Sequence, residues 1–538
     1  ADSPRQKKRR VGNDKTQSLV ENFLKWCNDV GLVLNDKVTV REEGSCHRFG
    51  MITLEDLDEG ETVFKIPRNI LLEPNASSLS ETVLEFAKNL PEIDTRNKWL
   101  PLLVTLLFEY SNPESKWRPY LDLVPSEAVL NQPIFWNQQE REYLALVGLN
   151  HGVENDERNI EEGYRDFVLP FMNKHAEFFD PKIHTLGLYK RLAGFVMAYS
   201  FTDNDNVDAK PAMVPMADIL NHVSENNAHL EFGEEFLSMV TTQTVEKGGE
   251  VFNTYGNLDN CNLLRSYGFI EESPNIFDEV VIPLKVFQDV LNLTDKEWEN
   301  RMSQFHSQYT KDHVNMDEGF FFNIEAGCSW SEQALYTFFQ IMHDKAVSNG
   351  TKPDLKPDKN NVDNDDSNVS IENKNTKNKN VQNKNSPSNS QKRSKFSHDI
   401  SKGGITVDNR GSEGDNGLES DSDEQSEGDG DTIEDSDGSD GDKIGYADGY
   451  VNDSDGSSSE SGESGLDWFD LKELPAEWKM TLKRAASVCA TKIKDLSEEL
   501  SKKFDKSLTT KRITMVNNIS HGHLTILEKV QDLFDLET

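Results

Sequence analysis

Three short clusters of polar and aromatic residues between Leu192 and Glu271 carry side chains that can do chemistry. Asn221-His222 is followed about thirty residues later by Tyr255-Gly256, and Tyr267-Gly268-Phe269 begins twelve residues beyond Tyr255. A plain apolar core does not produce this pattern. A tyrosine hydroxyl can align a reacting atom and stabilise charge near it, while Asn and His can hydrogen-bond to a bound molecule.

The residues around these clusters resemble those of a known family. The segments "LAGFVMAYSF", "MVPMADILNHVSENNAHLEF" and "EVFNTYGNLDNCNLLRSYGFIEE" are similar to SET-domain protein lysine methyltransferases. Within that superfamily they most resemble the branch of the plant Rubisco large-subunit methyltransferase, and in it SET domain-containing protein six and the fungal ribosomal-lysine methyltransferases. The resemblance implies transfer of a methyl group from S-adenosylmethionine to the side-chain amine of a lysine. It favours monomethylation of a non-histone protein, with a histone variant as a second candidate.

The resemblance assigns roles to the motif residues, each of which also has a structural alternative. Tyr255 corresponds to the catalytic tyrosine, and Tyr267 to a second tyrosine that lines the cofactor and lysine pocket. Alternatively, Tyr255 ends a strand at a turn and Tyr267 is a core aromatic residue. Asn221 and His222 correspond to cofactor-binding residues, although Asn221 also suits a turn and a lone His is often structural.

Four further positions are carried over from the resemblance. The family's glycine-rich cofactor loop corresponds to Arg48-Phe49-Gly50, in which Arg48 replaces the first glycine, so Phe49 and Gly50 are the predicted cofactor contacts. Tyr199 is predicted to contact both cofactor and lysine, or else to lie on one face of an amphipathic helix. Trp117 is predicted to lie near the substrate channel, although a packing role fits it at least as well.

Composition limits the classes of partner. The 95 acidic and 57 basic residues give a formal charge of -38, which argues against direct nucleic-acid binding and favours basic protein segments. The expected partner is a lysine-containing protein, such as a transcription factor, a histone variant or a ribosomal protein, and the chain is expected to be a monomer or to self-associate weakly. The five cysteines have no ligand spacing, so no metal site is expected. No segment has the roughly 20 apolar residues of a membrane helix.

The order of patterns along the chain predicts an α+β fold. Residues 17–282 are expected to form one β domain with a helical insertion at about 80–201, and the resemblance implies that this is a SET domain with a knot-like core. A helical, all-α C-terminal substrate-binding domain over 283–347 and 466–538 is interrupted by an insertion at 348–465. The expected strands are Val38–Val40, Gly50–Thr53 and Thr62–Ile66. The expected helices are Trp99–Tyr110, Gln138–Leu146, Asn159–His175, Leu186–Tyr199, Gln333–Val347, Pro475–Leu500 and Ile513–Phe534.

The remaining segments are predicted to be disordered. Residues 1–16 form a polar tail whose basic run, Lys7–Arg10, suggests nuclear localisation with a cytoplasmic pool. Residues 348–465 are rich in Lys and Asn and then in Asp, Ser and Gly, with too few apolar residues to form a core.

Two other classes of function remain open on the sequence. The SET fold can serve as a catalytically weak binding or scaffold protein, for which Arg48 is the only support. An acidic histone chaperone would instead act through residues 411–465, which contain 19 acidic residues and one basic residue, Lys443.

Overall fold

The computed structural model describes residues 19–42, 44–91, 98–203, 210–308, 319–344, 471, 474–504 and 510–533. These residues belong to one unit by their mutual contacts. The predicted basic tail, 1–16, and the predicted insertion, 348–465, lie outside the described residues. Among the helices described, none has the length and apolar character needed to cross a bilayer.

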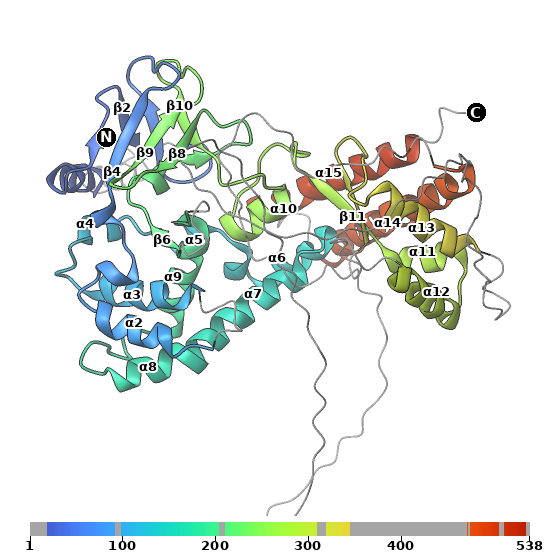
Figure 1. Ribbon diagram of the computed structural model, residues 1–538, viewed down its shortest axis with the longest axis horizontal. Helices are drawn as coiled ribbons and strands as arrows, with labels where there is room; N and C mark the ends of the chain where they lie inside the picture. The colour runs from blue at the N-terminus through green and yellow to red at the C-terminus, as the bar shows by residue number, and fades with distance from the viewer. Residues whose placement is uncertain are drawn as a thin grey trace, which may run out of the picture. The chain divides into compact units, whose positions relative to one another are not determined.

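Strands that are far apart in the sequence pair in two four-stranded sheets (Figure 1). The strand orders are β1-β4-β9-β8 and β2-β3-β10-β7. Met51 of β3 lies opposite Val251 of β10, and Phe64 of β4 lies opposite Met239 of β9; all four are buried. The strands are β1 Val33–Leu34, β2 Val38–Arg41, β3 Gly50–Thr53, β4 Thr62–Pro67, β7 Asn221–His222, β8 Ala228–Phe232, β9 Phe236–Thr241 and β10 Glu250–Asn253. The three N-terminal strands predicted from the sequence are therefore confirmed.

A helical block separates β4 from the later strands. It contains α2 Ser80–Lys88, α3 Leu100–Ser111, α4 Arg118–Leu121, α5 Glu127–Leu130, α6 Gln138–Glu142, α7 Asn150–Gly163, α8 Leu169–Lys174 and α9 Leu186–Tyr199, followed by the short pair β5 Ser200–Phe201 and β6 Ala212–Met213. α9 has the predicted bounds. The prediction of a helix starting at Asn159 was wrong, because α7 begins nine residues earlier in a polar stretch.

α7 is positioned by charge more than by apolar burial. Val153 and Gly163 are its only buried residues. The Arg265 guanidinium contacts Asp156 at 2.7 Å, and Glu157 pairs with both Arg141 and Lys190. Hydrophobic periodicity cannot reveal a helix that is held in this way.

The C-terminal part combines helices with one small sheet. After α10 Asn260–Asn262 come β11 Glu279–Pro283, α11 Leu284–Leu291, α12 Asp295–Gln308, β12 Gly319–Asn323, α13 Glu332–His343, α14 Ala476–Lys503 and α15 Lys511–Asp532. β11 and β12 pair antiparallel, with Val281 opposite Phe321. The prediction of an all-α domain did not include this sheet. Its strands are nearly continuous apolar runs, which periodicity does not distinguish from a buried helix.

A separate apolar cluster joins the C-terminal helices to the helical block and to the segment that carries Tyr267. Leu500 of α14 and Val516 of α15 are buried in one cluster with Trp136 and Leu264. These helices therefore pack directly on the part of the chain that holds the motif residues.

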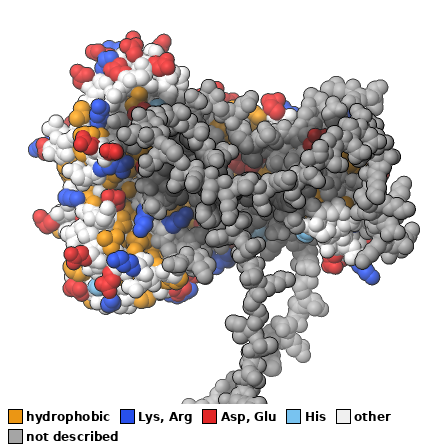
Figure 2. All heavy atoms as spheres, in the orientation of Figure 1, with side chains coloured by type: hydrophobic (Ala, Val, Ile, Leu, Met, Phe, Trp, Pro, Cys, Tyr) orange, Lys and Arg blue, Asp and Glu red, His pale blue; other side chains and the backbone are white. Residues whose placement is uncertain are grey.

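The surface of the described residues mixes charge signs. In Figure 2 acidic and basic side chains are interspersed with apolar ones over the coloured part of the visible face, mainly at its left. Several of the exposed ion pairs, such as Arg118 with Asp122, link neighbours in sequence.

Candidate functional site

The loop from Gly44 to Gly50 is held against β7 by the side chain of Asn221. The Asn221 amide nitrogen donates to the Phe49 carbonyl at 2.9 Å and to Glu250 Oε1 at 2.5 Å. Its amide oxygen accepts from the His47 backbone N–H at 3.3 Å. Asn221 is fully buried, so its side chain is engaged by the loop itself.

Glu250, at the start of β10, fixes the other side of this loop. Its carboxylate accepts from the Ser45 backbone N–H at 3.1 Å. A Cβ at Gly44 would lie 2.0 Å from the Phe49 carbonyl oxygen, and one at Gly50 would lie 2.9 Å from the backbone Cα of Gly44. Two glycines are thus required for close backbone approach. The family motif predicted Gly50 as a site residue but did not predict Gly44, which lies six residues before it.

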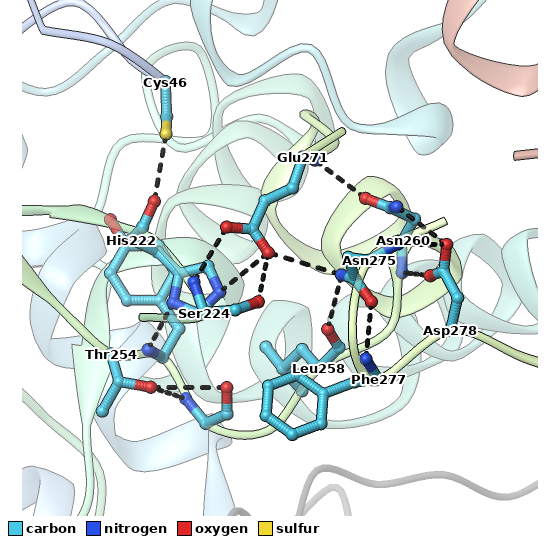
Figure 3. Close-up of polar contacts among 12 residues, drawn as sticks. Cys46, His222, Ser224, Thr254, Leu258, Asn260, Glu271, Asn275, Phe277 and Asp278 are labelled. Carbon is cyan, nitrogen blue, oxygen red and sulfur yellow. Dashed lines mark hydrogen bonds and ion pairs between the residues drawn. The ribbon is translucent and has the colours of Figure 1, made fainter. Parts of the chain in front are cut away.

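Tyr255 and Tyr267 come together as a stacked pair. Their ring centroids lie 4.8 Å apart at an interplanar angle of 27°. The Tyr255 hydroxyl donates to the Leu220 carbonyl at 2.9 Å, and its backbone N–H donates to His222 Nδ1 at 3.0 Å. Figure 3 shows this His222 ring beside the turn that begins at Thr254. The structure therefore places Tyr255, Tyr267 and His222 in one site.

Burial keeps both tyrosines protonated. Desolvation raises the pKa of Tyr267 to about 12, and it raises the pKa of Tyr255 well above its ordinary value. Nearby Tyr199 and Cys46 add to the shift at Tyr255. At neutral pH both side chains are neutral hydroxyls, which can donate and accept hydrogen bonds but cannot serve as bases.

A polar network fixes the segment that follows His222 (Figure 3). Glu271 accepts from the Ser224 backbone N–H at 2.8 Å and from the Ser224 hydroxyl. The Glu271 backbone N–H donates to Asn260 Oδ1 at 2.8 Å, and the Asn260 amide donates to Asp278 at 3.0 Å. His222 Nε2 lies 3.9 Å from Glu271 and has no hydrogen-bond partner. Burial lowers the pKa of His222, so its ring is neutral at neutral pH.

A hollow that is partly open to solvent, with about 480 Å³ of empty space including that open part, lies between this loop and the helical block. Its lining includes His47, Phe49, Tyr120, Tyr199 and Asp218. The His47 ring lies 5.7 Å from the Tyr199 ring and 5.1 Å from the Phe269 ring, measured between centroids. Phe49, Tyr199 and Asn221 are predicted site residues that line the hollow.

Asp218 is an acid in this hollow that the sequence reading did not select. The Tyr120 hydroxyl donates to Asp218 Oδ2 at 2.6 Å, while Oδ1 is buried without a partner. Burial raises the pKa of Asp218 to about 7. His47 Nε2 is likewise buried and unpaired, and burial lowers the pKa of His47 to about 4. The only sequence signal for Asp218 was its place three residues before Asn221.

Trp117 is not brought to the hollow. It is 1% exposed, and its indole N–H donates to the Ile70 carbonyl at 2.7 Å. It packs in the main core, so its geometry fits the packing alternative rather than a place beside the substrate channel. Its neighbour Tyr120 lines the hollow instead. Among the described residues, no group of three or more His, Cys, Asp or Glu side chains could hold a metal ion.

Comparison with known proteins agrees with this arrangement. A family model described as the SET domain matches residues 48–256. The N-lysine methyltransferase setd6 of Salmo salar is 41% identical over 342 residues, which cover 62% of this chain and 74% of the salmon protein. The chain belongs to this N-lysine methyltransferase family.

Other members of the family match over a shorter share of their length. The setd6 protein of Xenopus laevis is 43% identical over 289 residues, which cover 52% of this chain and 63% of that protein. The Danio rerio protein is 41% identical over 286 residues and is covered to 62%. The family resemblance predicted from the motif residues is confirmed.

A solved structure supports the fold. The structure of Rubisco LSMT bound to AdoMet has a TM-score of 0.52 and 14% sequence identity, over 96% of this chain and 92% of that chain. The SET-domain fold predicted from the sequence is therefore confirmed.

Proposed function

We propose that the protein transfers a methyl group from S-adenosylmethionine to the side-chain amine of a lysine in another protein. The observation that carries this proposal is the stacked Tyr255–Tyr267 pair, with the Tyr255 hydroxyl anchored on the Leu220 carbonyl, next to a glycine-containing loop and a hollow. Family membership supplies the reaction class.

The residues around the hollow fit a cofactor with both polar and apolar parts. His47 Nε2 and Asp218 Oδ1 line the hollow and are buried polar atoms without hydrogen-bond partners, and buried polar groups are ordinarily satisfied. The rings of Tyr199 and Phe269 provide apolar surface beside His47. When bound, S-adenosylmethionine supplies an electrophilic methyl group on a positively charged sulfur.

The chain's own residues prepare the lysine. A lysine side chain has a pKa of about 10.4 in water, so its ammonium must lose a proton before the nitrogen can react. Aromatic walls formed by Tyr199, Tyr255 and Tyr267 exclude water and disfavour the ammonium form. Because its hydroxyl proton is committed to the Leu220 carbonyl, the Tyr255 oxygen is available to accept from the amine N–H. Tyr255 thereby aligns the nitrogen and does not act as a base.

Asn221 and His222 support the site through the backbone in this proposal. Asn221 closes the Gly44–Gly50 loop, and His222 accepts from the Tyr255 N–H. The positions of Phe49 and Gly50 are consequences of that closure. A direct contact from Phe49, Gly50, Asn221 or His222 to the cofactor is part of the proposal.

Binding and turnover of the full chain test the proposal. Titration calorimetry with S-adenosylhomocysteine measures cofactor binding, and labelled S-adenosylmethionine on an array of lysine peptides measures transfer. Matched peptides with arginine in place of lysine are the control. Saturable binding together with lysine-dependent label is expected, whereas a chain that is folded but binds no S-adenosylhomocysteine would exclude the proposal.

We further propose that the substrate presents its lysine in a basic segment of a nuclear protein, which is monomethylated by a monomeric enzyme. The excess of acidic residues supports a basic partner, and the Lys7–Arg10 run supports nuclear import. Mass spectrometry of the product peptide counts the methyl groups, and light scattering measures the oligomeric state. Alanine replacement of Lys7–Arg10 in a fluorescent fusion should shift the protein to the cytoplasm.

A further inference from the structure

Consecutive side-chain amides hold the carbonyl of the residue before Tyr267 and the carbonyl of the residue after it. The Gln132 side-chain amide donates to the Ser266 carbonyl at 2.5 Å and to the Gly194 carbonyl at 2.9 Å. The Asn131 side-chain amide donates to the Gly268 carbonyl at 2.8 Å. The Tyr267 backbone is therefore fixed on both sides by the residues that follow α5.

The packing between these segments leaves no room for adjustment. Gly268 has φ +78°, and a Cβ at this position would lie 2.0 Å from the Leu130 carbonyl oxygen. Asn131 itself has φ +54°, a left-handed conformation that Asn tolerates better than most residues. Movement of the Leu130–Gln132 segment would thus be transmitted directly to the turn that carries Tyr267.

Arg512, near the start of α15, determines which way the Asn131 amide faces. Arg512 Nε donates to Asn131 Oδ1 at 2.7 Å. Because a guanidinium can only donate, it fixes the amide oxygen toward α15 and the amide nitrogen toward Gly268. Flipping the Asn131 amide would break both contacts at once.

Arg512 is itself held in place by two more groups. One terminal nitrogen donates to Glu140 Oε2 at 2.8 Å, and the guanidinium carbon lies 5.6 Å from the centroid of the Trp136 ring. The Glu140 side chain is only 7% exposed, so this ion pair is shielded from water. α15 also buries Ile513 and Val516 in the cluster that contains Leu264. Arg512 therefore sits at a fixed point of a packed interface.

We propose that Arg512 is a positioning residue for Tyr267, acting through Asn131 and the Gly268 carbonyl. The C-terminal helix α15 then shapes the tyrosine pair, whatever contacts the C-terminal region makes with a substrate. The proposal rests on the proposed function, in which Tyr267 lines the cofactor and lysine pocket.

The contacts from Arg512 to Asn131 and from Asn131 to the Gly268 carbonyl are called the relay. The test uses the full chain and separates the relay from the wider packing of α15 on the helical block. Arg512→Met removes the donor and keeps an unbranched apolar stem over Trp136. Asn131→Gly removes both amide contacts and tolerates the positive φ. Glu140→Gln breaks the ion pair on the other side of Arg512. Lys503→Ala is the matched control. It breaks the contact of Lys503 Nζ in α14 with Glu142 in α6 at 2.6 Å, which does not touch Asn131.

Three measurements are made on each variant. Hydrogen exchange of the unliganded chain reports opening of residues 264–269, calorimetry reports affinity for S-adenosylhomocysteine, and thermal unfolding reports stability. Arg512→Met and Asn131→Gly should each speed exchange of residues 264–269 and weaken binding by roughly tenfold, as expected for one lost charge-assisted hydrogen bond. The double variant should be no worse than either single variant, because the two residues act in one relay. Lys503→Ala should leave exchange of residues 264–269 unchanged, and Glu140→Gln, which loosens Arg512 but keeps its bond to Asn131, should speed exchange less than Arg512→Met does.

A purely structural role gives a different pattern. If Arg512→Met lowers the unfolding temperature but its exchange at residues 264–269 and its binding match those of Lys503→Ala, the relay is refuted. Additive losses in the double variant also refute it. If the wild-type chain binds no S-adenosylhomocysteine, the proposed function fails, but hydrogen exchange of the unliganded variants still decides whether Arg512 positions the Tyr267 turn.

Discussion

Replacement of Asn221 by alanine should open the loop from Gly44 to Gly50. The substitution removes two donated hydrogen bonds, to the Phe49 carbonyl at 2.9 Å and to Glu250 at 2.5 Å. It also removes the acceptor of the His47 N–H at 3.3 Å. The Ser45 contact to Glu250 and the Cys46 thiol contact to the His222 carbonyl at 3.3 Å remain, so the loop loses its amide links to β7 and keeps a weaker thiol link to β7 and the link to β10.

The size of the effect follows from the burial of these groups. Each buried hydrogen-bonding group left without a partner costs about 1–3 kcal/mol. Because the three contacts of Asn221 belong to one loop, their loss is not additive, and we expect a destabilisation of about 2–5 kcal/mol. If cofactor binding must restore the closed loop, the dissociation constant rises by about tenfold for every 1.4 kcal/mol of that loss.

Calorimetry with S-adenosylhomocysteine, together with thermal unfolding, measures both consequences. Asn227→Ala is the matched control, since the Asn227 side chain donates to the Glu250 carbonyl at 3.0 Å and accepts from the Phe252 N–H at 2.7 Å. That variant loses part-buried amide contacts to β10 without touching the Gly44–Gly50 loop. Asn221→Ala should weaken binding far more than Asn227→Ala does. Equal binding by the wild type and Asn221→Ala would refute the reasoning and leave Asn221 as a turn residue.

Two further predictions concern the hollow and the predicted insertion. The raised pKa of Asp218, about 7 in the folded chain against about 3.9 when unfolded, favours folding at low pH, a contribution that is lost as the pH rises through about 7. Asp218→Asn cannot ionise, so it does not lose this contribution. The unfolding temperature of the variant minus that of the wild type should therefore increase between about pH 4 and pH 7, whereas a constant difference would contradict the assigned pKa. Deletion of residues 350–465 should change the unfolding free energy by no more than about 1–2 kcal/mol, because loop-closure entropy varies only logarithmically with length. Calorimetric unfolding in two separate transitions would instead show that the flanking helices do not form one folded region.

The sequence predicted the elements whose apolar pattern matches their burial. α9 begins and ends where periodicity placed it, because seven of its residues, including Leu192 and Phe195, are buried on a helical spacing. α15 was placed within two residues at each end for the same reason. The start of α7 was missed because its contacts are ion pairs with Arg265, Arg141 and Lys190, and charge partners that are distant in sequence leave no local pattern.

In the candidate site, too, local motifs could be predicted from the sequence and contacts between distant residues could not. Tyr255, Tyr267, Asn221 and His222 were found because they form dense local motifs. Gly44 and Asp218 matter through contacts that are visible only in three dimensions, since Gly44 approaches the Phe49 carbonyl and Asp218 is bonded by Tyr120. For Trp117 the packing alternative fits the structure, because a motif position does not show whether a large ring faces a cavity or the core.

The central claim is that the Tyr255 hydroxyl aligns a lysine for methyl transfer. Tyr255→Phe removes only that hydroxyl and keeps the ring that stacks on Tyr267 and His222. With saturating S-adenosylmethionine and a lysine peptide that the wild type methylates, turnover should fall by roughly a hundredfold or more, as expected for the loss of a positioned catalytic group. Affinity for S-adenosylhomocysteine should stay close to that of the wild type. Near-normal turnover by Tyr255→Phe would contradict the account.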